Sequence, residues 1–334
     1  MAIRLAVDAM GGDRAPSAVV EGAIRAAQSA QEELEILLFG VEGELRSLMD
    51  AHGAPANLPI QIIHAPEVIG MGESPAAAVK GKPRSSIHLG LMAHKEGQAD
   101  AFISAGNTGA VMAASLFLLG RIPGVARPSV FGFIPTIQSY CILLDVGTNV
   151  DCKPEHLVQF AQMGTVYARS IMKRENPVVA LMNVGEEPGK GNEQIKEAFE
   201  LLSKAKGINF RGNIEGRDLL EHVADVVVCD GFVGNITLKF GESVSTALVR
   251  MIGAEMTKQG LTPEQQQMLM SVLRGVFRQF DYEEYGGAPL LGVAGTVLIG
   301  HGGSSARAFE KIILNAVTVA RQDIPGSISA ALGY

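Results

Sequence analysis

Cysteine is scarce in this sequence. Only three cysteines occur among 334 residues, Cys141, Cys152 and Cys229, and two of them (Cys141 and Cys229) lie inside apolar runs. An odd number of cysteines without paired spacing argues against a disulfide framework. Free cysteines of this kind are typical of a reducing compartment. We therefore expect reduced thiols and a cytoplasmic protein.

The sequence also lacks the common catalytic and cofactor motifs. Lys190 is followed by Gly191 rather than Ser or Thr, so no Walker phosphate loop is present. Gly300 and Gly302 are followed by Ser305, where a dinucleotide-binding fingerprint would place its third glycine. No His-Glu-x-x-His, Cys-x-x-Cys or Gly-x-Ser-x-Gly sequence occurs. We therefore expect no metal, no organic cofactor and no covalent acyl-enzyme.

Excess positive charge and long hydrophobic runs are missing too. The formal net charge is -7, which argues against a nucleic-acid partner. Asp8 and Asp13 interrupt the start of the chain, so we expect no signal peptide. The longest apolar run, around residues 110–119, is too short to span a bilayer. A soluble protein that could still touch a membrane surface fits these features.

What the sequence does contain is a repeated pattern of short apolar runs that end in Gly, Asn or Asp. Hydrophobic residues make up 47% of the chain, and helical patterns separate most of the runs. Such alternation predicts a Rossmann-like, layered α/β fold with a mostly parallel sheet. The expected strands are Ile3–Asp8, Leu34–Phe39, Ile60–His64, Ala101–Ser104, Val130–Ile134, Cys141–Asp145, Val178–Asn183 and Val226–Cys229. A short β-ribbon (286–300) and a helix (305–321) follow.

The length permits one large α/β unit or two lobes, and we expect a single catalytic unit over residues 1–334. Within it, residues 236–280 contain no strand pattern. Two helical segments there meet near residues 259–263, and one face of the second is apolar. We expect a projecting helical hairpin that packs on the body or on a twin subunit; the alternative is a tip that touches lipid.

Two strand-end loops, residues 106–109 and 231–235, open directly into helices. Ligands of open α/β sheets bind at the carboxyl ends of the strands. A helix start presents unpaired N–H groups, and glycine lets the backbone approach an oxyanion closely. These loops therefore predict an anion site built mostly from backbone, although each loop taken alone could be an ordinary turn.

Charged and titratable side chains near the strand ends are further candidates. Lys190 lies between two glycines and could reach a phosphate or a developing oxyanion, or could simply be a solvated lysine. His301 is the only histidine in a glycine-rich turn, and an acid–base, phosphate-binding or structural role is open to it. Lys80, Lys82 and Arg84 form a basic cluster that could receive an acidic partner or lie in solvent.

Six stretches share a pattern: Val7–Asp13 with Ala15 and Pro16, Ser104–Ala110, Leu144–Gly147, Asn183–Gly185 with Lys190–Asn192, Cys229–Asn235 and Gly295–Gly302. Taken together, they resemble the bacterial phosphate acyltransferases (PlsX) of phospholipid synthesis, along nearly the whole chain. The resemblance implies transfer of a fatty acyl group from acyl carrier protein to inorganic phosphate. The acyl phosphate is then used by a glycerol 3-phosphate acyltransferase. It also implies a homodimer, a fold related to phosphotransacetylases and isopropylmalate-type dehydrogenases, and a hairpin linked with peripheral membrane association, here 236–280.

The chemistry that the family implies needs no side-chain nucleophile. Phosphate is nucleophilic near neutral pH, and a thiol of pKa about 8.5 leaves readily as a thiolate. We hypothesise direct attack on the thioester, with Lys190, Asn235 and His301 as catalytic candidates and Lys80, Lys82 and Arg84 as the carrier-docking cluster. The expected substrate- and phosphate-binding residues are Asp8, Gly11, Gly106, Asn107, Thr108, Gly109, Asp145, Asn183, Asp230, Gly231 and Gly234.

Three other functions remain open at this point. A phosphotransacetylase that uses short acyl-CoA would have similar loops. Its preferred acyl chain length would distinguish it from an enzyme that transfers fatty acyl groups from acyl carrier protein. A nicotinamide-dependent hydroxyacid dehydrogenase of related fold would require a metal and change nicotinamide absorbance. A non-enzymatic scaffold for lipid or carrier would bind acyl carrier without releasing a thiol.

Overall fold

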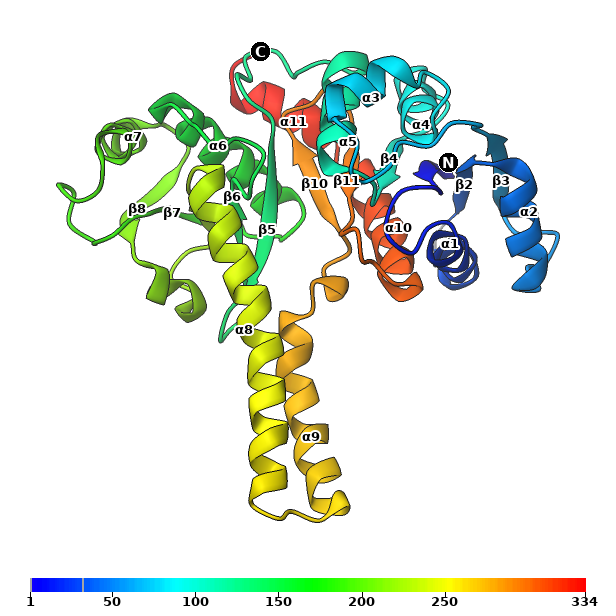
Figure 1. Ribbon diagram of the computed structural model, residues 1–334. Helices are drawn as coiled ribbons and strands as arrows, with labels where there is room; N and C mark the ends of the chain where they lie inside the picture. The colour runs from blue at the N-terminus through cyan, green and yellow to red at the C-terminus, as the bar shows by residue number, and fades with distance from the viewer. Residues whose placement is uncertain (1, 32) are drawn as a thin grey trace. The chain divides into compact units, whose positions relative to one another are not determined.

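The computed structural model describes residues 2–31 and 33–334, and for Tyr282 the backbone only. Its contacts divide the chain, which we expected to form a single catalytic unit, into two compact units. Unit 1 contains residues 1–130, 162–176 and 285–334, and unit 2 contains residues 131–161 and 177–284. Figure 1 labels the elements of both units.

Unit 1 has a mostly parallel sheet in the order β3-β2-β1-β4-β11-β10. Only its last pairs are antiparallel: β10 with β11, and β10 with the first two residues of β5. Val, Ile, Leu and Phe dominate these strands, and β4 and β11 are buried along their whole length, as parallel strands covered on both faces require. The strands are β1 (Ile3–Asp8), β2 (Leu34–Gly40), β3 (Ile60–His64), β4 (Ala101–Ser104), β10 (Ala288–Leu291) and β11 (Val297–Ile299).

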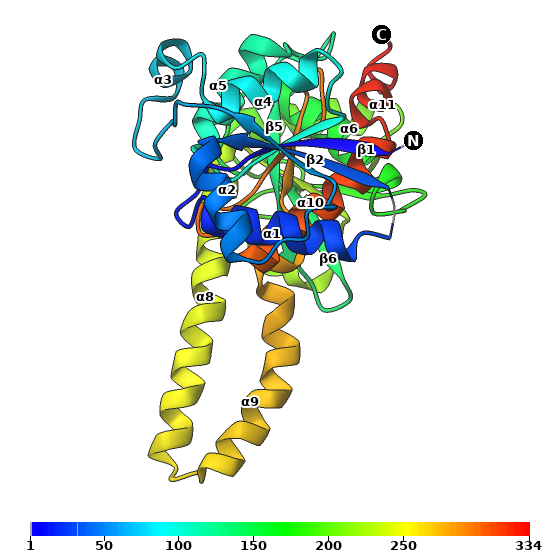
Figure 2. The same ribbon diagram turned by 90° about the vertical axis from the view of Figure 1, so that its right-hand side faces the viewer.

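Helices cover both faces of this sheet. On one face α1 and α10 lie side by side, and on the other lie α4 and α5 (Figures 1 and 2). At Gly22 of α1 a Cβ atom would lie 2.4 Å from Cβ of Phe309 in α10, so the absence of a side chain lets the two helices approach closely. The helices of unit 1 are α1 (Ser17–Ser29), α2 (Glu42–Ala51), α3 (Pro75–Gly81), α4 (Ser86–Lys95), α5 (Thr108–Leu118), α10 (Ala306–Arg321) and α11 (Ile324–Ala331).

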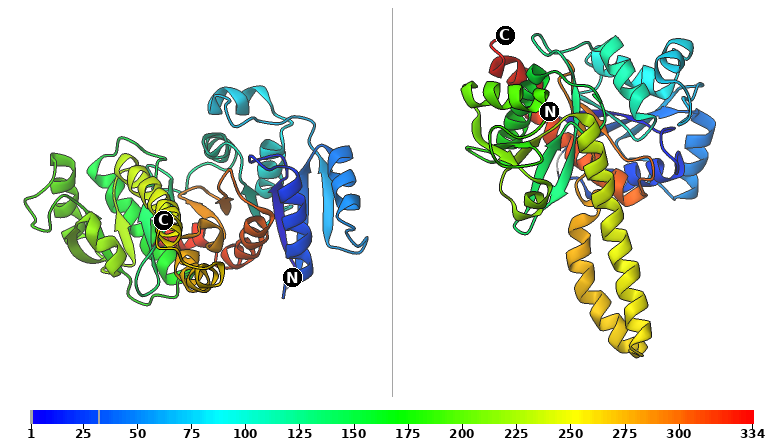
Figure 3. Two further views of the ribbon diagram at one scale, coloured as in Figure 1. Left: turned by 60° about the horizontal axis from the view of Figure 1, so that its bottom comes forward. Right: turned by 60° about the vertical axis from the view of Figure 1, so that its left-hand side comes forward.

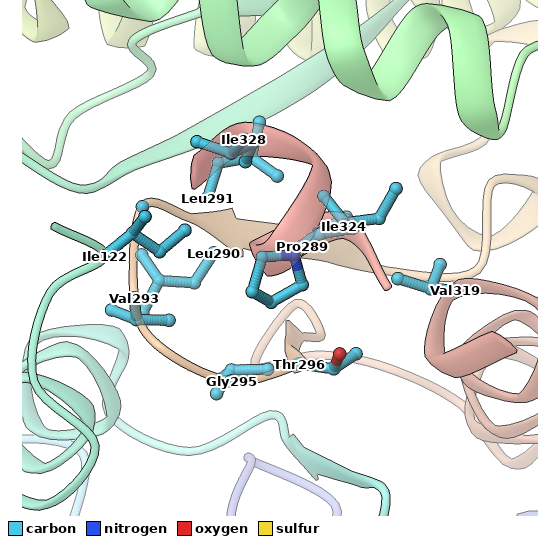
Figure 4. Close-up of a pocket in the computed structure, with 13 residues that line it drawn as sticks. Ile122, Pro289, Leu290, Leu291, Val293, Gly295, Thr296, Val319, Ile324 and Ile328 are labelled. Carbon is cyan, nitrogen blue, oxygen red and sulfur yellow. The ribbon is translucent and has the colours of Figure 1, made fainter. Parts of the chain in front are cut away.

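A small apolar cavity of about 10 Å³ lies where α11 packs on β10 and β11 (Figure 4). Pro289, Ile324 and Ile328 line it together with other apolar side chains. A cavity of this size holds at most one water molecule. The cavity is therefore a small packing defect in the core and not a binding site for an acyl chain.

Unit 2 is built on the sheet β5-β6-β9-β7-β8. Only β5 and β6 are antiparallel, and β6, β9, β7 and β8 run parallel. Its core contains Leu143, Ala180, Val227 and Cys229, all at most 1% exposed. The elements are β5 (Ser129–Pro135), β6 (Tyr140–Leu144), β7 (Val178–Met182), β8 (Asn209–Ile214), β9 (Val226–Val228), α7 (Glu193–Lys204), α8 (Gly231–Lys258) and α9 (Pro263–Phe277); α6 (Pro154–Ser170) begins in unit 2 and ends in unit 1.

The hairpin of unit 2 has the two helices expected from the sequence, α8 and α9, which extend beyond the sheet of that unit (Figures 1 and 3). Thr262 caps α9 in a capping box with Gln265, and Pro263 is its first residue. The two helices meet at the turn and diverge from it (Figure 2). Within the described part of the chain, no helix is both long enough and apolar enough to cross a bilayer.

All eight strands expected from the apolar runs are present, with bounds that differ by at most one residue at each end. The sequence did not indicate β8, because Arg211, Gly212 and Asn213 interrupt its apolar pattern. The strand lies at the edge of the sheet, where it pairs with β7, and a register irregularity occurs where Gly212 adopts φ 110°. Edge strands tolerate such bulges and polar residues.

The start of α8 packs so closely on the end of β6 that it requires glycine. A Cβ atom on Gly234 would lie 1.8 Å from the carbonyl oxygen of Asp145, whereas a Cβ on Gly241 of the same helix would meet nothing within 4 Å. We predict that Gly234→Ala lowers the free energy of unfolding by more than about 2 kcal/mol through overpacking. Gly241→Ala should raise it by about 0.5–1 kcal/mol, because alanine favours the helix.

Urea unfolding of the two variants, followed by circular dichroism, checks this pair. Equal effects of the two substitutions would show that the close contact at Gly234 does not determine stability.

Candidate functional site

The carboxyl ends of the parallel strands gather the predicted residues into two clusters, one in each unit. In unit 1, β1, β4 and β11 are neighbours, and their ends lead to Asp8, Gly106 and His301. In unit 2, β6, β9 and β7 are neighbours, and Leu144 is in register with Val228. Their ends lead to Asp145, Asp230 and Asn183, and so to the same edge of that sheet.

In the first cluster a buried carboxylate holds the backbone of two loops. The hydroxyl of Ser104 donates to Asp8 Oδ2 at 2.6 Å and accepts from the N–H of Gly106 at 3.0 Å. The N–H of Met10 donates to Asp8 Oδ1 at 3.1 Å. Burial raises the pKa of Asp8, while hydrogen bonds from Ser104, Ser86, Met10 and the next residue oppose that rise.

The two loops touch through their backbones. A Cβ atom on Gly11 would lie 2.3 Å from Asp8 Oδ2 and 2.6 Å from the nitrogen of Gly106. Glycine is therefore needed at position 11 so that the loop after β1 can approach the backbone of Gly106, as expected of a loop that positions backbone N–H groups.

Asn107 uses its whole side chain to hold the start of α5. Its Oδ1 accepts from the N–H of Ala110 at 3.1 Å, and its Nδ2 donates to the carbonyls of Met71 (3.1 Å) and Glu73 (2.9 Å). Thr108 and Gly109 form the first turn of α5, where backbone N–H groups have no acceptor within the helix. The N–H groups of this turn are thus the ones that can receive an anion.

His301 lies in the turn after β11 and is exposed. Its Nδ1 accepts from the N–H of Gly303 at 3.2 Å, so this nitrogen carries no proton in that arrangement. One ring nitrogen of His301 therefore makes a structural hydrogen bond, which is one of the roles that the sequence left open. The catalytic role of His301 stays a prediction.

In the second cluster Asp145 repeats the arrangement of Asp8. It is fully buried, and its Oδ1 accepts from the N–H groups of Gly147 (2.9 Å) and Thr148 (2.8 Å). Its Oδ2 accepts from the side-chain amide of Asn149. Burial raises the pKa of Asp145, and these hydrogen bonds oppose the rise.

The start of α8 closes on this loop. Asp230 caps the helix, with Oδ1 accepting from the N–H of Val233 at 2.9 Å, and the N–H of Gly231 donates to the carbonyl of Asn149 at 2.8 Å. The side-chain amide of Asn235 would lie 2.6 Å from a Cβ on Gly147. The side chain of Asn235 thus lies against the loop after β6 and is exposed.

Asn183 organises the loop that carries Lys190. Its Nδ2 donates to the carbonyl of Lys190 at 3.1 Å, and its Oδ1 accepts from the N–H of Val184 at 2.8 Å. Lys190 is exposed, and within residues 2–31 and 33–334 its ammonium group has no ion-pair partner. The loop therefore presents an available cation beside the strand ends of unit 2.

The two buried cysteines of unit 2, Cys141 and Cys229, are poor nucleophiles. Burial raises the pKa of Cys141 to about 12 and that of Cys229 well above its ordinary value. The nucleophile of cysteine chemistry is the thiolate, which these sites disfavour.

Several side chains that were predicted to bind phosphate make local hydrogen bonds within the protein. Those of Asp8, Asn107, Asp145, Asn183 and Asp230 are engaged in holding loops and helix starts, so their expected contact with phosphate stays a prediction. Sequence reasoning did not single out Ser104 or Asn149 as their partners. For Ser104, a hydroxyl at the last position of an otherwise apolar strand was the available indication.

Two of the three basic residues of the predicted docking cluster remain exposed. Lys80 and Arg84 lie at the surface of unit 1. Lys82 is instead turned inward: its Nζ donates to Glu73 at 2.6 Å and to the carbonyl of Val68 at 2.7 Å. Its charge is thereby balanced within the protein.

Comparison with known proteins identifies the family. A family model described as fatty acid synthesis protein matches residues 3–326. The "Phosphate acyltransferase" of Salinibacter ruber is 56% identical over 330 residues, covering 99% of this chain and 98% of that protein. The "Phosphate acyltransferase" of Chlorobaculum tepidum is 48% identical, covering 97% and 100%.

Solved structures confirm the expected fold class. A phosphotransacetylase from Streptococcus pyogenes matches with a TM-score of 0.65 at 19% identity, covering 96% of this chain and 95% of that one. The EutD phosphotransacetylase from Staphylococcus aureus matches with a TM-score of 0.61 at 15% identity, covering 96% and 94%. At these identities the likeness concerns the fold alone. From the family model and the close relatives, the chain belongs to the fatty acid synthesis protein family and, within it, to the phosphate acyltransferases.

Proposed function

We propose that this enzyme transfers a fatty acyl group from acyl-acyl carrier protein to inorganic phosphate. The observation that carries the proposal is the 56% identity, over nearly the whole chain, to a relative named phosphate acyltransferase. The strand-end loops support it, because they present helix-start amides, an exposed amide and an exposed lysine but no activated nucleophile. The product is an acyl phosphate, which a glycerol 3-phosphate acyltransferase would use next.

In the proposed reaction a phosphate oxygen attacks the thioester carbonyl carbon. The new C–O bond forms, the C–S bond breaks, and the thiolate of the carrier leaves and takes a proton from solvent. Lys190 balances the charge of phosphate and of the developing oxyanion. Asn235 donates from its side-chain amide to the thioester oxygen or to phosphate. The enzyme's contribution is thus positioning and charge stabilisation.

In unit 1, the first turn of α5 supplies the backbone donors Thr108 and Gly109 for an anionic group, next to Gly106, whose own N–H donates to Ser104. Asp8 keeps this loop in place through Ser104 and acts as a positioning residue. His301 is the weaker catalytic candidate, because one of its ring nitrogens already accepts a backbone hydrogen bond.

The second candidate function is phosphotransacetylase activity on a short acyl-CoA. Two solved structures of the same fold are named phosphotransacetylases, so this is the activity to test beside the first. The acyl chain length of the preferred donor decides between the two.

The hairpin is proposed to contact a second copy of the chain. Apolar side chains along α8 and α9 remain exposed in the single chain, among them Phe240 (68%), Met251 (66%) and Val272 (67%). Monomeric proteins rarely expose contiguous apolar surface of this kind. A homodimer would cover it, and the alternative is attachment to a lipid surface.

The proposed reaction is tested by measuring thiol release from long-chain acyl-acyl carrier protein with and without inorganic phosphate, with hydroxylamine to trap the product. We predict phosphate-dependent release and a trapped acyl hydroxamate. Lys190→Ala and Asn235→Ala should each lower kcat about 10²–10³-fold, the usual effect of losing an oxyanion donor. Lys204→Ala, which removes an exposed lysine paired with Glu200, is the matched control and should change kcat less than about twofold.

Different outcomes contradict different parts of the proposal. Near-normal turnover in both Lys190→Ala and Asn235→Ala would make the residue assignment wrong. Activity on acetyl-CoA but not on the long-chain carrier would favour the phosphotransacetylase. Binding of acyl carrier without any thiol release would indicate a scaffold.

The hairpin proposal is tested with the double variant Met251→Glu, Val272→Glu. Two buried carboxylates would disfavour the dimer, so light scattering should give the mass of a dimer for the wild type and of a monomer for the variant. Gln267→Glu adds one negative charge at an exposed polar position of α9 and should leave the dimer intact. A dimer that survives the double variant, together with lost pelleting on phospholipid vesicles, would assign this surface to lipid instead.

A further inference from the structure

Unit 1 contains an open hollow of about 410 Å³ that none of the site residues described above lines. It lies between the first half of α1 and the start of α10. The residues that line it are Arg14, Ser17, Ala18, Glu21, Arg25, Ser305, Ala306 and Arg307.

The hollow is basic on a protein that is acidic overall. Arg14, Arg25 and Arg307 are all exposed, and the only carboxylate among the lining residues, Glu21, pairs with Arg25. The whole chain carries a net charge of -7. Three guanidinium groups gathered against one carboxylate therefore make a local field of the opposite sign to that of the rest of the protein.

The walls of the hollow are held rigidly. A Cβ on Gly22 would lie 2.7 Å from the carbonyl of Ala306, so α1 and α10 are in backbone contact there. The N–H of Asp13 also donates to the carbonyl of Gly302 at 2.7 Å, which joins the chain segments leading into the two helices. Arg14 and Arg307 thus project from segments fixed to each other, and the cost of arranging them around a partner is reduced.

The hollow lies next to the strand-end loops of unit 1. Both α1 and α10 follow strands of the parallel group β1, β4 and β11 and therefore start at their carboxyl edge. A Cβ on Gly12 would lie 3.1 Å from the carbonyl of Gly302 and 3.4 Å from that of Ala105, the residue before Gly106. A partner seated in the hollow would therefore be close to the loop that opens α5.

We propose that this hollow is the docking surface for the acidic surface of acyl carrier protein, an inference that rests on the proposed function. Arginine binds carboxylates through two parallel N–H groups, which suits three guanidiniums to an acidic protein surface. The cluster at residues 80–84 is the alternative; there Lys82 pairs with Glu73, as Arg25 pairs with Glu21 in the hollow. That cluster spans the end of α3 and the segment between α3 and α4. The hollow is preferred because its arginines stand on segments that are fixed to each other beside the strand-end loops.

The experiment measures the Kd of the full-length enzyme for apo- and holo-carrier, by fluorescence anisotropy at several salt concentrations. The variants are Arg14→Glu and the neutral triple variant Arg14→Gln, Arg25→Gln, Arg307→Gln, with circular dichroism as the check on folding. Lys80→Glu with Arg84→Glu tests the alternative cluster. Lys204→Glu controls for the change in net charge.

We expect both hollow variants to raise the Kd for apo- and holo-carrier at least about tenfold at low salt, and to flatten its dependence on salt. The control and the 80–84 variant should stay near the wild-type value. An unchanged Kd in the triple variant would overturn the proposal, and so would a loss confined to Lys80→Glu with Arg84→Glu.

Two further outcomes are decisive. A rise in the Kd for holo-carrier alone would show that the hollow binds the phosphate of the carrier's prosthetic arm. That result would overturn the proposal that the hollow binds the carrier's protein surface. If the hollow variants lose carrier binding while the wild-type enzyme forms no acyl phosphate, the docking surface stands and the proposed reaction fails.

Discussion

The rest of this protein depends on one interaction: the hydrogen bonds that a buried aspartate accepts from the loop after its own strand. Asp8 does this at the end of β1 and Asp145 at the end of β6. A carboxylate is stable in such a buried position only because donors surround it. The bonds in turn fix the path of each loop, and glycines at positions 11 and 234 allow the next segment to approach within backbone contact.

This arrangement accounts for the chemistry that we assign to the strand ends. The carboxylates are enclosed and their oxygens are occupied, so the groups left at the surface are helix-start amides, the amide of Asn235 and the ammonium of Lys190. Such groups stabilise negative charge and cannot form a covalent intermediate with an acyl group as readily as a thiolate would. The buried cysteines, with raised pKa values, fit the same description.

Much of the fold could be predicted from the sequence, because buried parallel strands appear as apolar runs and end at Gly, Asn or Asp. Helix caps are equally local: Ser85 and Ser305 cap α4 and α10. The edge strand β8 was missed because polar residues interrupt it. The inward turn of Lys82, the bond between Ser104 and Asp8, and the hollow between α1 and α10 depend on contacts between distant segments, which one sequence does not reveal.

The central claim is that phosphate attacks the thioester directly and that no side chain carries the acyl group. The most direct measurement mixes acyl-acyl carrier protein with labelled free carrier and enzyme, and leaves phosphate out. Direct attack predicts no labelled acyl carrier until phosphate is added, because the C–S bond breaks only when phosphate is the acceptor. Label that enters the acyl carrier without phosphate, at the rate of turnover, would show an acyl-enzyme and contradict the account.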